Sequence, residues 1–118
     1  MLIVTDQPLV GLGVQAALAS PQGARAQVAH PALVGQCCGA FDLVLLDLEA
    51  RGAAKHAAQL RRLHAESPLV LLAARPDSTV AARLGAQACL SKTLRMAELS
   101  RALQALVERQ RGQRERAA

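Results

Sequence analysis

The stretch Phe41-Asp42-Leu43-Val44-Leu45-Leu46-Asp47 decides the fold of this chain. Four consecutive apolar residues, from Leu43 to Leu46, are typical of a strand buried on both faces, as in the centre of a parallel sheet. The run ends at an acid, Asp47. Because open α/β sheets place their ligand crevice at the carboxyl ends of the strands, a carboxylate at this position indicates a functional site.

Strands and helices alternate along the rest of the chain. Besides residues 41–47, we expect strands over residues 2–5, 24–29, 69–72 and 87–90, and helices over residues 8–20, 31–38, 53–66, 78–84 and 96–107. Such alternation predicts a parallel sheet covered by helices on both faces, and right-handed crossovers leave few topologies. We therefore expect an α/β fold, a flavodoxin-like (βα)5 doubly wound parallel sheet with strand order 2-1-3-4-5.

The composition limits the class of protein. A chain of 118 residues is expected to form one domain with its own core, and with Phe41 as its one aromatic residue that core must be leucine, valine and alanine. No apolar run is long enough to cross a bilayer, and Met1 leads straight into an apolar strand without the charged start of a signal peptide. We therefore expect a cytoplasmic protein with no membrane partner.

Cysteines and histidines give no metal or redox motif. Cys37, Cys38 and Cys89 lack CxxC and Cys/His ligand spacing, and adjacent cysteines bridge only with strain, so reduced thiols are expected. His56 and His64 fall on one predicted helix, where we interpret both as surface residues.

The C-terminal end is basic. Within a net charge of +5, residues 108–118 hold four arginines against two glutamates. Such an end could touch nucleic acid, but without aromatic residues or a second basic face we interpret it as a solvated helix end. The expected organisation is a domain over residues 1–107 followed by a basic helix end or linker over residues 108–118.

The predicted strand order brings three charged residues together. Asp6 and Asp47 follow neighbouring strands, and Lys92 follows the fifth strand at the same edge. Mg²⁺ accepts one or two carboxylates with water, an Asp is a possible nucleophile toward phosphorus, and a Lys neutralises phosphate oxygens. These residues therefore suit phosphoryl transfer. The alternative is structural: Asp6 caps the first helix and Lys92 only pairs with Asp47.

Three segments in order resemble the receiver domain of two-component response regulators, especially those of the NarL/FixJ (LuxR-type) family. They are IVTDQPLV at 3–10, FDLVLLDL at 41–48 and GAQACLSK at 85–92. The resemblance implies that Asp47 accepts a phosphoryl group from a sensor histidine kinase, with Lys92 on the phosphoryl oxygens. It also implies a Mg²⁺ site made by Asp6, Asp47 and the backbone carbonyl of Glu49. On this reading the chain is a signalling module rather than an enzyme.

Several positions depart from the family pattern. Thr5 stands where receivers carry a second acid, which should weaken Mg²⁺ binding. Ala73 stands where a hydroxyl normally binds the phosphoryl group, a loss of roughly 1.5–3 kcal/mol of coupling. Cys89 replaces the aromatic residue that commonly moves on activation, and the loop after Asp47 lacks the usual proline. Two readings remain: an atypical receiver phosphorylated on Asp47, or a degenerate receiver that acts as a phosphorylation-independent protein-interaction module.

Other classes fit less well. A flavin carrier of the same sheet order needs a phosphate-cradling loop after the first strand and aromatic residues for the flavin ring, but residues 5–8 offer little hydroxyl or glycine content and Phe41 is the one aromatic residue. A phosphatase with an Asp nucleophile and a second Asp two residues later would find Glu49 there. The resemblance also implies homodimers and control of transcription through a C-terminal DNA-binding domain, for which residues 108–118 would be the linker.

Overall fold

The computed structural model describes residues 1–17, 26–36 and 41–117 of the chain. Its sheet is parallel throughout and has the order β2-β1-β3-β4-β5, which confirms the expected topology. The strands are β1 (Leu2–Val4), β2 (Gln27–Ala29), β3 (Val44–Asp47), β4 (Leu69–Ala73) and β5 (Ala88–Ser91). The central strands β1, β3 and β4 are fully buried, as their unbroken apolar runs predict.

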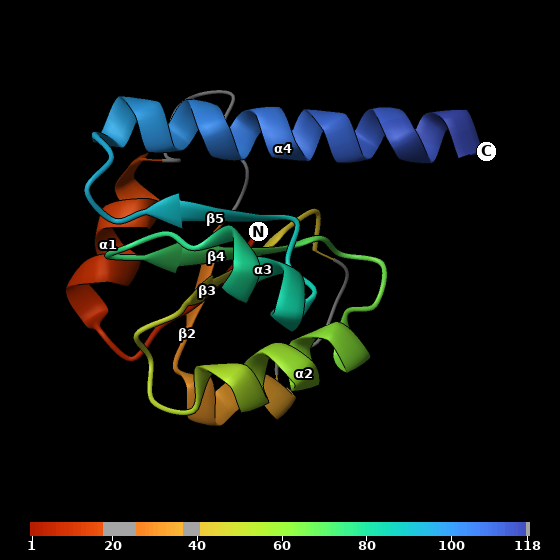
Figure 1. Ribbon diagram of the computed structural model, residues 1–118. Coiled ribbons are helices and arrows are strands. Elements are labelled where there is room, and N and C mark those ends of the chain that lie inside the picture. The colour runs from red at the N-terminus through yellow and green to blue at the C-terminus, as the bar shows by residue number, and fades with distance from the viewer. Residues whose placement is uncertain (18–25, 37–40, 118) are drawn as a thin grey trace.

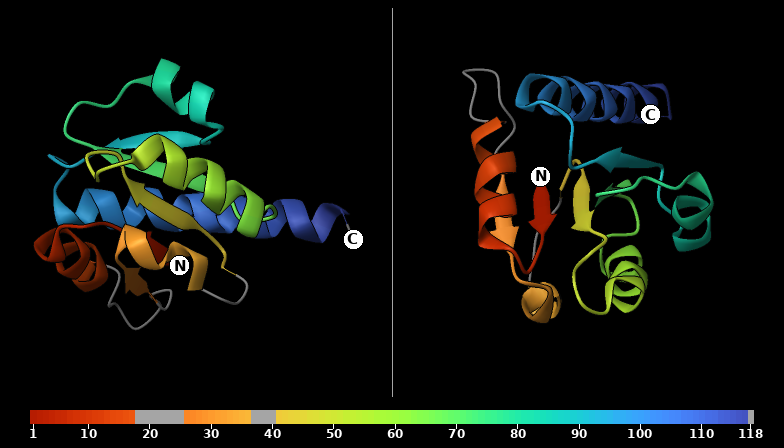
Figure 2. Two further views of the ribbon diagram at one scale, coloured as in Figure 1. Left: turned by 90° about the horizontal axis from the view of Figure 1, so that it is seen from below. Right: turned by 60° about the vertical axis from the view of Figure 1, so that its left-hand side comes forward.

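Helices cover both faces of the sheet (Figures 1 and 2). On one face lie α1 and α4, and on the other lie α2, α3 and the short 3₁₀ helix η1. Their bounds are α1 (Pro8–Ala17), η1 (Pro31–Gln36), α2 (Ala53–Leu63), α3 (Ser78–Leu84) and α4 (Met96–Ala117). The chain is thus a doubly wound three-layer fold, and the carboxyl ends of all five strands meet at one edge.

Successive residues of each central strand enter different cores. Ile3, Leu45 and Val70 pack with residues of α1 and α4, including Val14 and Leu103. Their neighbours Val4, Leu46 and Leu71 pack instead with residues of η1, α2 and α3. This follows from the two-residue period of a strand, which sends alternate side chains to opposite faces. Burial on both faces explains why these strands are continuously apolar.

The ends of α3 are set by local chemistry. Asp77 caps its start by accepting a hydrogen bond from the Thr79 amide at 2.8 Å, and Gly85 follows its last turn with φ of +75°. The amide of Ala86 donates to the carbonyl of Ala81 at 2.8 Å, the backbone pattern that closes a helix at a left-handed residue. Both predicted ends of this helix are confirmed.

Other boundaries differ from the sequence-based expectation. The strand expected over residues 41–47 begins only at Val44, where pairing with Leu69 begins. The predicted third helix ends three residues early, at Leu63, while α4 continues past residue 107 to Ala117 and projects beyond the sheet (Figure 1). The expected ends near Ser20 and Ala24, and the cysteines Cys37 and Cys38, lie outside the described residues.

The prediction that His64 lies on the surface was wrong. Because α2 ends at Leu63, His64 leaves the helix and its ring packs edge-on against Phe41, with 5.2 Å between the ring centroids. Its side chain is 8% exposed. The imidazole therefore belongs to the core.

No helix in the described ranges is long and apolar enough to cross a membrane.

Candidate functional site

Four strands end at the same edge of the sheet, and three of them bring a polar side chain there. Thr5 follows β1, Asp47 is the last residue of β3, Ala73 ends β4 and Lys92 follows β5. The parallel register pairs Val4 with Leu46 and Ala73 with Ser91, so these positions are level with one another. The predicted meeting of Asp47 and Lys92 is therefore present in the structure.

Asp47 is a buried carboxylate with three hydrogen-bond donors. It is 2% exposed. Its Oδ1 lies 2.7 Å from the Lys92 Nζ and accepts from the Glu49 amide at 3.1 Å. Its Oδ2 accepts from the Thr5 hydroxyl at 2.7 Å. These contacts use three of the four lone-pair positions of the carboxylate and hold it in one orientation.

The charges of this pair are stabilised by each other. Burial acts to raise the pKa of Asp47, but the hydrogen bonds from Lys92, Thr5 and the Glu49 amide hold that pKa below its usual value. Burial acts to lower the pKa of Lys92, and its contacts with Asp47 and Glu49 raise it instead. Asp47 is therefore ionised at neutral pH, the state that a nucleophilic carboxylate requires.

Asp6 is tied to the loop after β3. Its Oδ2 accepts from the Arg51 amide at 3.3 Å, and the amide of Gln7 donates to the Thr5 hydroxyl at 3.1 Å. The alternative in which Asp6 caps α1 thus differs from the contact observed. Asp6 reaches the same loop that carries Glu49, on the side of the crevice away from β4 and β5.

The donor set suits a hydrated Mg²⁺ held by few protein ligands. Asp47 keeps one lone-pair position on Oδ2, and Asp6 and the Glu49 carbonyl would have to supply further oxygens of the type that Mg²⁺ prefers. Thr5 contributes its hydroxyl to Asp47 rather than a second charge. Over residues 1–17, 26–36 and 41–117, no group of three or more His, Cys, Asp or Glu could hold a metal ion. Water would have to complete the coordination.

The Glu49 side chain is a contact that the sequence-based reasoning missed. One carboxylate oxygen lies 3.2 Å from the Lys92 Nζ, and the other accepts a hydrogen bond from the Ala74 amide. The sequence had indicated only the backbone carbonyl of Glu49. The available signal was an acid two residues after Asp47, close enough to reach the same cation.

Ala73 and Cys89 add no polar group to the crevice. Ala73 is buried at the end of β4 and carries no hydroxyl. Cys89 is half-buried and packs against the core cluster on the face of the sheet that α2 and α3 cover. The structure therefore does not bring Cys89 to Asp47.

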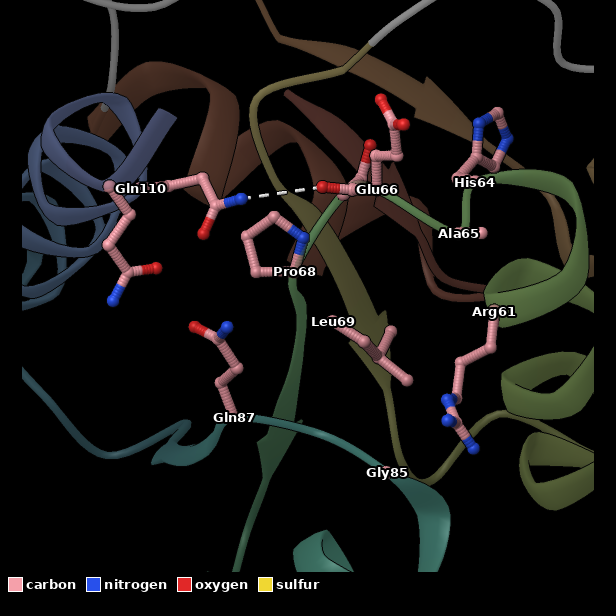
Figure 3. A pocket seen from close by; sticks show the side chains of 11 residues that line it. Arg61, His64, Ala65, Glu66, Pro68, Leu69, Gly85, Gln87 and Gln110 are labelled. Atoms are coloured by element: carbon pink, nitrogen blue, oxygen red, sulfur yellow. Dashed lines mark hydrogen bonds between the residues drawn. The ribbon is translucent and has the colours of Figure 1, made fainter. Parts of the chain in front are cut away.

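Two hollows differ in their relation to Asp47. The first hollow, of about 410 Å³, lies where β4 begins, at the end of the sheet away from Asp47. Arg61, Gln87 and Gln110 surround it (Figure 3). A smaller one of about 110 Å³ adjoins Lys92 and is lined mainly by apolar residues, Leu9 and Leu94 among them. Only the smaller hollow adjoins the candidate site.

The comparisons with known proteins identify the fold. No protein-family model and no curated protein matches the sequence. NtrX from Brucella abortus, solved with ADP, superposes with a TM-score of 0.80 at 20% identity over 98% of this chain, which spans 28% of NtrX. A CheY-like response regulator receiver domain protein from Methanospirillum hungatei has a TM-score of 0.77 at 15% identity, covering 95% of both chains.

A third similar structure is that of a bacterial response regulator. The response regulator TrrA from Thermotoga maritima, in complex with Mg²⁺ and beryllofluoride, has a TM-score of 0.73 at 23% identity, covering 89% of this chain and 96% of TrrA. At these identities the similarity concerns the fold. The chain has the CheY-like flavodoxin fold found in response regulator receiver domains.

Proposed function

We propose that this chain is a receiver domain that accepts a phosphoryl group on Asp47. The observation that carries the proposal is the buried Asp47 carboxylate at the end of β3, with the Lys92 ammonium 2.7 Å away. The shared fold of response regulators supports it. The proposed partner is a sensor histidine kinase, and the proposed location is the cytoplasm.

The chemistry assigned to these residues is a single displacement. A carboxylate oxygen of Asp47 forms a bond to phosphorus while the P–N bond of the donor's phosphohistidine breaks and the released imidazole takes up a proton. Lys92 neutralises charge on the transferred group, since an ammonium beside a phosphoryl oxygen acts as a point charge. The product is an acyl phosphate, so the chain stores the group rather than turning over a substrate.

Magnesium is the proposed cofactor. Asp6, Asp47 and the Glu49 carbonyl would hold it, and the ion would offset negative charge as the phosphoryl group approaches. With Thr5 in place of a second acid, we expect the binding to be weak.

We further propose an organisation around this domain. Residues 1–107 form the receiver and residues 108–118 form the basic helix end or linker that leads toward an output domain. By its resemblance to NarL/FixJ regulators, that output is transcription control through a DNA-binding domain, with receivers pairing as homodimers. The projection of α4 past the sheet suits such a connection (Figure 1).

A second candidate function is a receiver that binds partners without phosphorylation. The contacts of Asp47 favour it, because Thr5, Lys92 and Glu49 already hold the carboxylate, and Ala73 offers no hydroxyl to a phosphoryl group. In that case the crevice network would serve the stability of the fold.

Incubation with acetyl phosphate and Mg²⁺ followed by intact-mass measurement separates the two. A receiver gains the mass of one phosphoryl group, and the gain disappears in Asp47→Asn. Asp42→Asn, which changes a carboxylate outside the crevice, should leave the gain intact. Unmodified wild-type protein under all conditions would support the phosphorylation-independent function.

A further inference from the structure

The Glu49 carboxylate spans two anion-binding groups. One of its oxygens contacts the Lys92 Nζ at 3.2 Å, and the other accepts from the Ala74 amide. These donors come from different strands, since Ala74 follows β4 and Lys92 follows β5. A charged donor and a backbone N–H that converge on one carboxylate form a small anion seat.

This seat adjoins the phosphoacceptor itself. Lys92 is shared, because its Nζ also lies 2.7 Å from the Asp47 Oδ1. An oxyanion attached to Asp47 would use Lys92 and the Ala74 amide as donors, and the two oxygens of the Glu49 carboxylate now occupy both. The side chain is therefore placed where two oxygens of such a group would lie.

The Glu49 carboxylate and an incoming oxyanion cannot occupy the seat together, because both are negatively charged. Glu49 and Asp47 already place two negative charges on one ammonium. Like charges a few ångströms apart repel each other, so an incoming oxyanion and the Glu49 carboxylate would oppose each other. Glu49 can leave by rotation of its own side chain, because that side chain is 37% exposed to solvent.

We propose that Glu49 is a built-in competitor for the anion seat formed by Lys92 and the Ala74 amide, and that a tetrahedral oxyanion enters only by displacing it. The inference rests on the proposed function in that the seat belongs to the same crevice. It adds a regulatory role for Glu49, which restrains occupancy of the seat in the resting protein.

Titration with inorganic phosphate, followed through the Ala74 amide signal by NMR, tests the proposal without any covalent step. Glu49→Ala should bind phosphate about tenfold more tightly than wild type, as expected for removal of one opposing charge contact. Glu49→Asp is the decisive variant. It keeps the charge but is one methylene shorter, so its carboxylate no longer reaches both donors and it should also bind more tightly than wild type.

Glu108→Gln is the matched control, because it removes one exposed carboxylate from α4 and should bind phosphate as wild type does. Equal affinity in wild type, Glu49→Ala and Glu49→Asp would overturn the proposal. Tighter binding by Glu49→Ala but not by Glu49→Asp would also overturn it, since net charge alone would then explain the effect.

The proposed function can fail separately. If acetyl phosphate leaves both wild type and Glu49→Ala unmodified while Glu49→Ala and Glu49→Asp bind phosphate more tightly at Ala74, the competitor role holds and phosphorylation of Asp47 does not. If Asp47 is phosphorylated while all variants bind phosphate equally, the function holds and the competitor role fails.

Discussion

Asp47 depends on Lys92 more than on any neutral donor, because Lys92 is the one cation in direct contact with it among the described residues. Replacing Lys92 by Met leaves a buried carboxylate with only the Thr5 hydroxyl and the Glu49 amide. We expect the pKa of Asp47 to rise in Lys92→Met, which carboxyl ¹³C NMR can follow. The free energy of unfolding at neutral pH should fall by about 2 kcal/mol.

The pH dependence of that loss has a definite sign. The pKa of Asp47 in the folded protein lies below that of an ordinary aspartate, so its ionised form stabilises the fold fully at pH values above the ordinary pKa. The stabilisation disappears as pH falls through the lowered pKa. Wild type and Lys92→Met should therefore converge in stability as the pH falls below that lowered pKa. Lys55→Met, on the exposed side of α2, should show neither effect.

Ala73 supplies a second prediction at the residue scale. Ala73→Ser restores a hydroxyl at the end of β4, where a phosphoryl mimic bound to Asp47 would find a donor. Since a hydrogen bond to a charged group contributes about 1.5–3 kcal/mol, beryllofluoride with Mg²⁺ should bind at least about tenfold more tightly, measured by ¹⁹F NMR. Ala74→Ser puts the hydroxyl one residue further on and should not help. Equal affinity in all three proteins would contradict the assignment of this site.

Among the elements, α3 depends on the left-handed conformation of Gly85. With φ of +75°, an L side chain there is strained, so Gly85→Ala should lower the free energy of unfolding by about 1 kcal/mol. Gly85→Asn should lose less, because Asn adopts this conformation more readily. Urea denaturation measures both. If Gly85→Ala is as stable as wild type, the end of α3 does not depend on a left-handed residue at position 85.

The exposed leucines of α1 give a prediction about the partner. Leu9 and Leu12 are 83% and 59% exposed, and Leu9 also lines the small apolar hollow beside Lys92. Exposed apolar side chains near the proposed phosphoacceptor would suit contact with the phosphohistidine protein proposed to supply the phosphoryl group. Leu9→Ser with Leu12→Ser should slow phosphotransfer from the kinase and leave labelling by acetyl phosphate unchanged.

Leu63→Ser is the control for α1, because Leu63 is also exposed but lies on α2. If it slows transfer as much as the α1 variant does, the effect is general and α1 is not the docking surface.

For the whole molecule, the face made by α3, β5 and α4 is the expected contact between copies. β5 forms one edge of the sheet and is only half-buried, which leaves backbone groups of an edge strand available. We expect the sedimentation coefficient to rise with protein concentration, and to rise further with a phosphoryl mimic. A constant monomer under both conditions would contradict homodimer formation.

The sequence by itself determined the order of elements, the parallel sheet and the position of Asp47 and Lys92 at one edge. Unbroken apolar runs at β3 and β4 are typical of strands buried on both faces, and alternation with helices then leaves few topologies, of which the structure has the expected one. Local signals were equally sufficient at Asp77 and Gly85, because a cap is made by residues next to one another.

Only the tertiary structure decided the burial of His64 and the contacts of Glu49. His64 turns inward because α2 ends early and Phe41, distant in sequence, offers its ring. Glu49 finds the amide of Ala74 across 25 residues and shares Lys92 with Asp47. Periodicity reports which face a residue occupies, but the partner of a loop side chain depends on how separate strand ends meet in space.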